Sequence, residues 1–126
     1  MRHEGVFNCT VEVRTQRKEL QLREVGVAGP LDGDHVAQKL GSAMDGLGAC
    51  LASAAHLGQT VHGHYWIAFE IRPDGSVGRV EWMERPSATP SLSRCLFGVI
   101  RERRFDHAAA RTIADLRLYL GGLSKL

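Results

Sequence analysis

Residues 64–77 are HYWIAFEIRPDGSV, an alternating segment followed by a tight-turn sequence. The alternation begins near Thr60, ends at Arg72 and is typical of a half-buried β-strand. Asp74-Gly75 tolerates the positive φ angles of a tight hairpin turn, so the chain should return antiparallel. The returning strand would use Val77, Val80 and Trp82. The residues expected on the buried side are Tyr65, Ile67, Phe69 and Ile71, opposite His64, Trp66, Ala68, Glu70 and Arg72.

A helix is predicted on each side of this hairpin in the chain. Between residues 35 and about 56, apolar residues recur at helical spacing, and Asp32 or Asp34 can cap the start of the helix. The second helix begins at Thr89-Pro90, an N-cap residue followed by proline in the first turn. Each helix should bury one face against the strands.

Two further regions alternate between apolar and polar residues. Residues 9–14 and 20–27 predict an N-terminal hairpin, and residues 112–120 predict the last strand. This order of elements predicts an α+β fold, in which an antiparallel sheet has two helices packed on one face and an N-terminal β-hairpin is added. We expect residues 1–28 to form the hairpin extension and residues 29–126 to form the main domain.

The composition is that of an ordinary globular domain. The 126 residues are 44% hydrophobic and 24% charged, with a formal net charge of +2, which argues against disorder and against nucleic-acid binding. No apolar run approaches the roughly 18 to 20 residues of a membrane span. The first residues, MRHEGVFNC, lack the pattern of a signal peptide. If the protein is exported, we expect its targeting segment to be missing from this chain.

Two cysteines occupy matching places on the two predicted helices. Cys50 and Cys95 are both expected on the buried faces, with the Asp-Gly turn between them in the sequence. They are either small buried hydrophobic residues or partners in a disulfide. A disulfide would indicate an oxidising compartment. The odd cysteine, Cys9, is read as a strand residue, with intermolecular pairing or a reactive thiol as the alternatives.

Residues with recognisable site chemistry are few. His62 and His64 would share a strand face, which suggests zinc, but a structural zinc needs about four ligands and the sequence has no CxxC or HExxH pattern. We therefore expect no metal, no cofactor and no catalytic residue.

The last strand is expected to lie at the boundary of the sheet. Its unpaired N–H and C=O groups could then accept a strand from a partner, unless the front hairpin pairs with it instead. The open sheet face is a second possible interface. The edge-strand binding residues would be Arg111, Ile113, Asp115, Arg117 and Tyr119, and the sheet-face residues would be His64, Trp66 and Glu70.

The stretch from about Leu31 to Leu120 resembles the TonB C-terminal domain, of the type found in myxobacterial envelope and gliding-motility proteins. Both cysteines belong to the pattern, each within a predicted helix, and an arginine-aromatic sequence ends the second helix. The matching segments are residues 48–51 (GACL), 67–77 (IAFEIRPDGSV), 90–96 (PSLSRCL) and 103–105 (RRF).

The resemblance implies a non-enzymatic periplasmic module with no membrane span of its own. Such a module would bind an extended peptide segment of an envelope protein, or another partner, by β-strand addition within an envelope complex. It also supports the disulfide reading of Cys50 and Cys95. Two alternatives stay open: an accessory structural subunit covered by a partner or by a second copy in a homo-oligomer, and a small metal-binding protein or enzyme.

Overall fold

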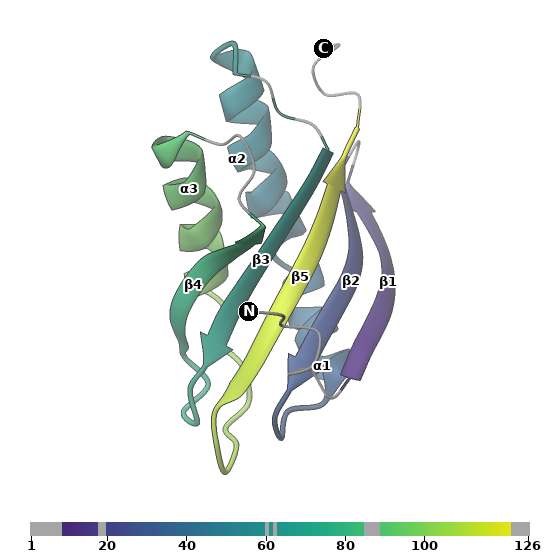
Figure 1. Cartoon of the computed structure of the whole chain (residues 1–126), viewed down its shortest axis with the longest axis vertical. Coiled ribbons are helices and arrows are strands. Elements are labelled where there is room, and N and C mark those ends of the chain that lie inside the picture. Colours follow the sequence, from purple (N-terminus) through teal and green to yellow (C-terminus); the bar gives the residue numbers. More distant parts are fainter. Residues whose placement is uncertain (1–8, 18–19, 60, 62, 85–88, 122–126) are drawn as a thin grey trace.

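The structure, a computed structural model, describes residues 9–17, 20–59, 61, 63–84 and 89–121, without the side chains of residues 9–17. The strands form one sheet in the order β1-β2-β5-β3-β4, and all neighbouring strands are antiparallel. The described helices lie together on one face of this sheet (Figure 1). The predicted α+β fold is therefore confirmed. The elements are β1 (Cys9–Arg17), β2 (Leu20–Ala28), α1 (Gly33–Gly41), α2 (Met44–His56), β3 (Gly63–Ile71), β4 (Val77–Glu84), α3 (Pro90–Arg101) and β5 (Thr112–Leu120).

The β3–β4 hairpin forms at the Asp-Gly turn, as the sequence predicts. The N–H of Gly75 donates to the carbonyl of Arg72 at 2.8 Å, and Gly75 has a φ of 89°. The Asp74 carboxylate accepts hydrogen bonds from the hydroxyl and the N–H of Ser76, and these bonds lower the pKa of Asp74. The turn is also attached to the loop after α3, because the N–H of Phe105 donates to the carbonyl of Gly75 at 2.9 Å.

The predicted boundary position of the last strand is wrong. β5 pairs with β2 on one side and with β3 on the other along almost its whole length. The N-terminal hairpin is the reason, because β2 occupies the side of β5 that was expected to be free. The backbone of β5 is therefore not available for strand addition. The outermost strands of the sheet are β1 and β4 (Figure 1).

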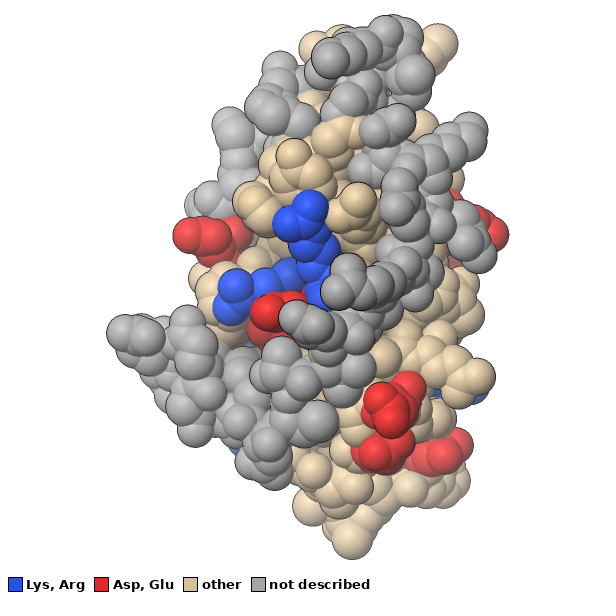
Figure 2. All heavy atoms as spheres, turned by 90° about the vertical axis from the view of Figure 1, so that its right-hand side faces the viewer, with Lys and Arg blue, Asp and Glu red and all other residues tan. Residues whose placement is uncertain are grey.

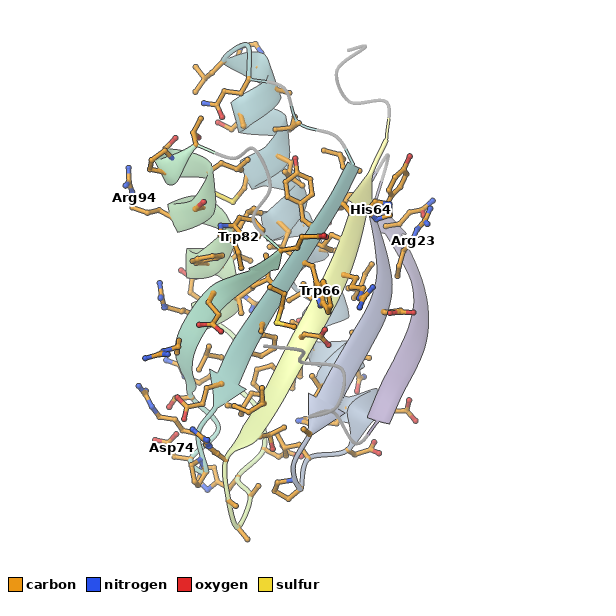
Figure 3. The ribbon with its side chains drawn as sticks, viewed as in Figure 1. Arg23, His64, Trp66, Asp74, Trp82 and Arg94 are labelled. Carbon is orange, nitrogen blue, oxygen red and sulfur yellow. A yellow bond between two sulfur atoms is a disulfide. The ribbon has the colours of Figure 1, made fainter. Side chains whose placement is uncertain are left out.

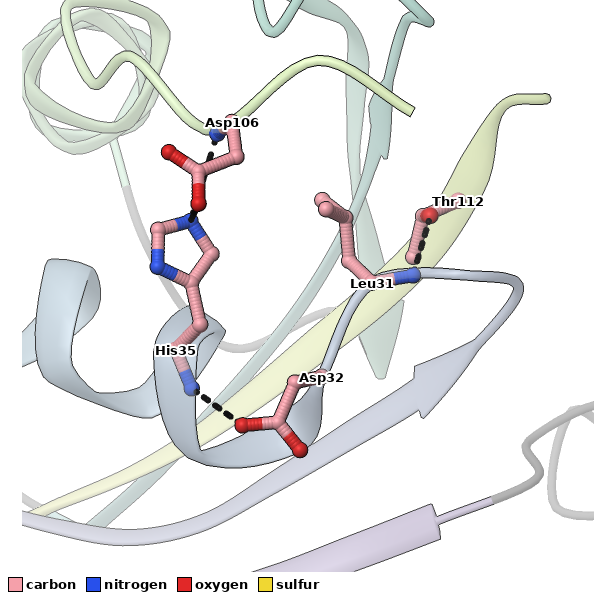
Figure 4. Close-up of polar contacts among 5 residues, drawn as sticks. All are labelled: Leu31, Asp32, His35, Asp106 and Thr112. Carbon is pink, nitrogen blue, oxygen red and sulfur yellow. Dashed lines mark hydrogen bonds and ion pairs between the residues drawn. The ribbon is translucent and has the colours of Figure 1, made fainter. Parts of the chain in front are cut away.

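The single long helix predicted after the first hairpin is instead two helices. α1 ends at Gly41, and the hydroxyl of Ser42 donates to the carbonyl of Lys39 at 2.6 Å, where it competes with helix continuation. α2 then starts at Met44. The predicted caps are present: the carboxylate of Asp32 accepts from the N–H of His35 at 3.3 Å (Figure 4) and the hydroxyl of Thr89 accepts from the N–H of Leu92 at 3.2 Å.

The core lies between the helices and the inner face of the sheet. Gly46 of α2 lets α3 approach closely, since a β-carbon there would lie 3.0 Å from Cγ1 of Val99. None of the described helices is both long and apolar enough to cross a membrane. The largest fully buried side chains are Phe69, Leu20, Leu22, Leu40, Met44, Leu47, Leu51, Ile67, Ile71, Leu96, Ile100 and Leu116.

A disulfide between Cys50 and Cys95 joins α2 to α3. Cys50 is buried, with 4% of its surface exposed. Cys95, however, is exposed, so its predicted burial is wrong. The buried face of α3 consists of Leu92, Leu96 and Ile100. Cys95 lies beside this face and reaches sideways to α2.

Candidate functional site

The outer face of the sheet has no described helix over it, and it brings together the two sets of predicted site residues. Because β5 lies next to β3, His64 is opposite Tyr119 and Trp66 is opposite Arg117. Glu70 is opposite Ile113 in the same register. We call this surface the open face. It consists of Arg23, Glu24, His64, Trp66, Glu70, Ile113, Asp115, Arg117 and Tyr119, and three of these residues are labelled in Figure 3.

Asp115 connects three strands at the centre of the open face. Only 5% of its surface is exposed. One carboxylate oxygen accepts the N–H of Gly26 at 2.7 Å, and the other accepts the indole N–H of Trp66. Burial raises the pKa of Asp115 above its ordinary value of 3.8, although both N–H donors and the nearby Arg117 favour the charged form. The carboxyl group thus fixes the indole ring in place.

Arg117 lies over that indole ring. Its guanidinium carbon is 3.7 Å from the ring centroid, a cation–π geometry. Its Nε is also 3.4 Å from a carboxylate oxygen of Glu24, and both side chains are about two-fifths exposed. An ion pair this exposed contributes about 0 to 1 kcal/mol to stability. The arrangement mainly holds Trp66 and Arg117 in a defined orientation at the surface.

A second arginine–aromatic pair lies farther along the same face. The guanidinium carbon of Arg23 is 4.3 Å from the ring centroid of Tyr119, and the ring of His64 is 5.0 Å from that of Tyr119. Nε of Arg23 donates to the side-chain oxygen of Gln21 at 2.9 Å. Among the described residues, no carboxylate lies within ion-pair distance of Arg23. Figure 2, which views the side of the molecule that has β1 and β2, shows basic side chains close together with an acidic side chain against them.

The remaining predicted residues lie at the other end of the open face. Arg111, which precedes β5, has a guanidinium nitrogen 3.4 Å from a carboxylate oxygen of Glu70. Ile113 is half-buried near the start of β5, where it pairs with β3. All five residues predicted for the last strand are therefore on or beside the open face, and none is on a free edge.

One polar contact away from the open face has a structural role. The N–H of Asp106 donates to Nε2 of His35 at 3.2 Å, and this contact ties α1 to the loop after α3 (Figure 4). Among the residues that the structure describes, no group of three or more His, Cys, Asp or Glu is placed to hold a metal ion. His62, part of the zinc hypothesis, lies outside the described residues.

Sequence reasoning missed the contribution of β2 to the open face. Arg23 and Glu24 come from the N-terminal hairpin, whose pairing with β5 was considered only as the alternative to a free edge. Comparison with protein-family models, with curated proteins and with solved structures finds no match to this chain. The open face itself displays tryptophan, tyrosine and arginine, the side chains most enriched at the energetic centres of protein interfaces.

We expect Asp115 to make folding less favourable as the pH rises. Because its pKa is raised in the folded state, the folded protein holds this proton more tightly than the unfolded chain does. The contribution to stability is fully present below pH 3.8, the ordinary value, and is lost as the pH rises through the raised pKa. Urea unfolding of wild type and Asp115→Asn across this range should show the free-energy difference, wild type minus variant, falling with pH.

Asp74→Asn is the matched control, for which the free-energy difference should change with pH in the opposite direction. The pKa of Asp74 is lowered by Ser76, so its contribution is lost as the pH falls through the lowered pKa. The corresponding difference for Asp74 should therefore rise with pH. A difference for Asp115 that rises with pH would show that its two N–H donors outweigh burial, and a flat one would show that they offset it; either result would contradict the expectation.

Proposed function

We propose that this chain is a non-enzymatic protein-interaction module of the TonB C-terminal type, working in a cell-envelope complex in the periplasm. The observation that supports it best is the open face, where the outward residues of β2, β3 and β5 form an ordered arginine–aromatic surface. The disulfide between Cys50 and Cys95 is compatible with an oxidising compartment.

The partner we propose is a protein segment with acidic side chains. Nε of Arg23 is held by Gln21 and its guanidinium plane lies near Tyr119, while the rest of the group has no acidic partner among the described residues. A guanidinium held in this way can receive a carboxylate through two parallel hydrogen bonds. Exposed His64 and half-buried Trp66 lie on the same face and would contact the same partner.

A peptide pair provides a direct test. One capped hexapeptide alternates glutamate with leucine, and its counterpart replaces each glutamate with glutamine. In NMR titrations of the whole chain, the glutamate peptide should shift the indole N–H signal of Trp66 and the amide signals of Arg23 and Tyr119. The glutamine peptide should bind more weakly, because it cannot form charge-assisted hydrogen bonds.

Variants assign the effect to Arg23. Arg23→Gln should weaken binding of the glutamate peptide about tenfold or more, because the charge-assisted hydrogen bonds of the guanidinium are lost. Arg94→Gln, an exposed change on α3, should leave the affinity unchanged. Equal binding of both peptides, or signal shifts confined to the helices, would reject the open face as the docking surface.

Strand addition, the mode that the TonB resemblance implies, is the second candidate. It would need an outer strand, because β5 is paired on both sides. The two outermost strands of the sheet, β1 and β4, are the candidates for the acceptor.

A further inference from the structure

We propose that β4 pairs antiparallel with β4 of a second copy of this chain, around a twofold axis at Val80. This inference concerns the sheet edge and is independent of the acidic partner proposed for the open face. The second copy would occupy β4, one of the two outermost strands that strand addition could use.

β4 is an edge strand with one neighbour. It ends the sheet order, and its only strand partner among the described residues is β3 (Figure 1). The outer N–H and C=O groups of an edge strand can template pairing with another strand. The register between β3 and β4 shifts between Val77 and Val80 and again between Trp82 and Glu84, so Val80–Trp82 is the regular run and Arg79 borders it.

The charges of β4 are complementary to themselves. Arg79 and Glu81 lie on the same side of the strand, with Nη1 and Oε1 4.0 Å apart, and their side chains are 80% and 46% exposed. When Val80 faces Val80 of a second antiparallel β4, each Arg79 stands directly opposite the other copy's Glu81. Opposite charges in such cross-strand positions stabilise the pair.

The same charges select one register. Moving the axis by one residue in either direction places Arg79 opposite Arg79, or Glu81 opposite Glu81, and like charges directly opposite each other are destabilising. Charges on an edge commonly prevent unspecific strand pairing. Here they would exclude other pairings and admit the self-complementary one.

Apolar surface beside the edge supports the same arrangement. Trp82 of β4 and Phe97 of α3 are both half-buried, with ring centroids 5.2 Å apart, and Trp82 lies toward α3 in Figure 3. Because Arg79 and Glu81 must meet on one face, the twofold axis is perpendicular to the sheet, and the helices of both copies lie on the same side. The two α3 helices then flank the joined β4 strands and cover this aromatic pair.

Charge exchange tests the pairing. Sedimentation equilibrium of the wild type over a range of concentrations should show a monomer–dimer equilibrium. Arg79→Glu and Glu81→Arg should each raise the dissociation constant about tenfold or more, because each creates two like-charge pairs. The double variant Arg79→Glu/Glu81→Arg should restore the wild-type constant, since both pairs are again of opposite sign.

Mixing the two single variants gives the most specific test of the charge pairing. Equal amounts of the two single variants should form a mixed dimer tighter than either homodimer, because every cross-strand pair in it is complementary. Asp34→Lys is the charge-reversal control, because Asp34 is exposed on α1, which packs on β1 and β2 at the other side of the sheet, and it should leave the constant unchanged. A wild type that is monomeric at every concentration, or a double variant as weak as the single variants, would overturn the proposal. Unchanged circular dichroism spectra exclude misfolding as the cause of any loss.

Discussion

Reduction of the disulfide between Cys50 and Cys95 is expected to lower the free energy of unfolding by about 4 kcal/mol. The cysteines are 45 residues apart in the sequence, and the bond connects α2 to α3. In the chain-entropy model, a cross-link over a loop of this length removes conformations from the unfolded chain and so favours the folded state. The native helix contact at Gly46 and Val99 remains after reduction, so the folded structure should persist with lower stability.

Cys95→Ser is the cleaner of the two possible cysteine variants. Cys95 is exposed, whereas Cys50 is buried, so a serine at position 50 would also bury a hydroxyl group. Urea unfolding should give the same reduced stability for Cys95→Ser and for reduced wild type, and reductant should not weaken the variant further. An unchanged wild-type midpoint after complete reduction, verified by intact mass after thiol blocking, would contradict the expected stabilisation.

The parts of the fold that the sequence predicts correctly depend on neighbouring residues. The period of two before Arg72, the Asp74-Gly75 turn and the Thr89 cap are all set within a few positions along the chain, and each forms as expected. These signals also predict the α+β class, because they fix the type and order of the elements.

The wrong prediction for β5 concerns contacts between distant segments. Whether β5 lies inside the sheet depends on where the N-terminal hairpin adds, about 90 residues earlier, and no local pattern reports that choice. The break between α1 and α2 did have a local signal in Gly41-Ser42. Apolar residues continue across this break at helical spacing, so the pattern of side chains concealed it.

In the candidate site, too, local patterns were predicted correctly and contacts between distant segments were not. The outward positions of β3 and β5 were readable from their alternation, but their meeting on one face required the strand order. Arg23 and Glu24 had an overlooked signal: the buried residues Leu22 and Val25 are three apart instead of two, and the register between β2 and β5 shifts there. Such a β-bulge lets two consecutive residues face outward, which is how both side chains reach the open face.

Gly75→Ala is expected to lower the free energy of unfolding by about 3 kcal/mol. Gly75 has a φ of 89°, which residues with a β-carbon rarely adopt. An added β-carbon would also overlap the carbonyl oxygen of Phe105, whose backbone N–H is bonded to Gly75. The ring of Phe105 is buried with its centroid 6.0 Å from that of Phe69, so the loop cannot retreat without disturbing the core.

Gly58→Ala separates the effect of backbone strain from the effect of the overlap with Phe105. Gly58 has nearly the same φ, 87°, but a β-carbon there would meet no heavy atom within 4 Å. Its substitution should cost only the backbone strain, about 1 kcal/mol. In urea unfolding, the difference between the two variants therefore measures how firmly the β3–β4 turn is packed against the loop after α3. Equal losses would mean that this loop moves aside freely, and that the turn is held by its own backbone geometry alone.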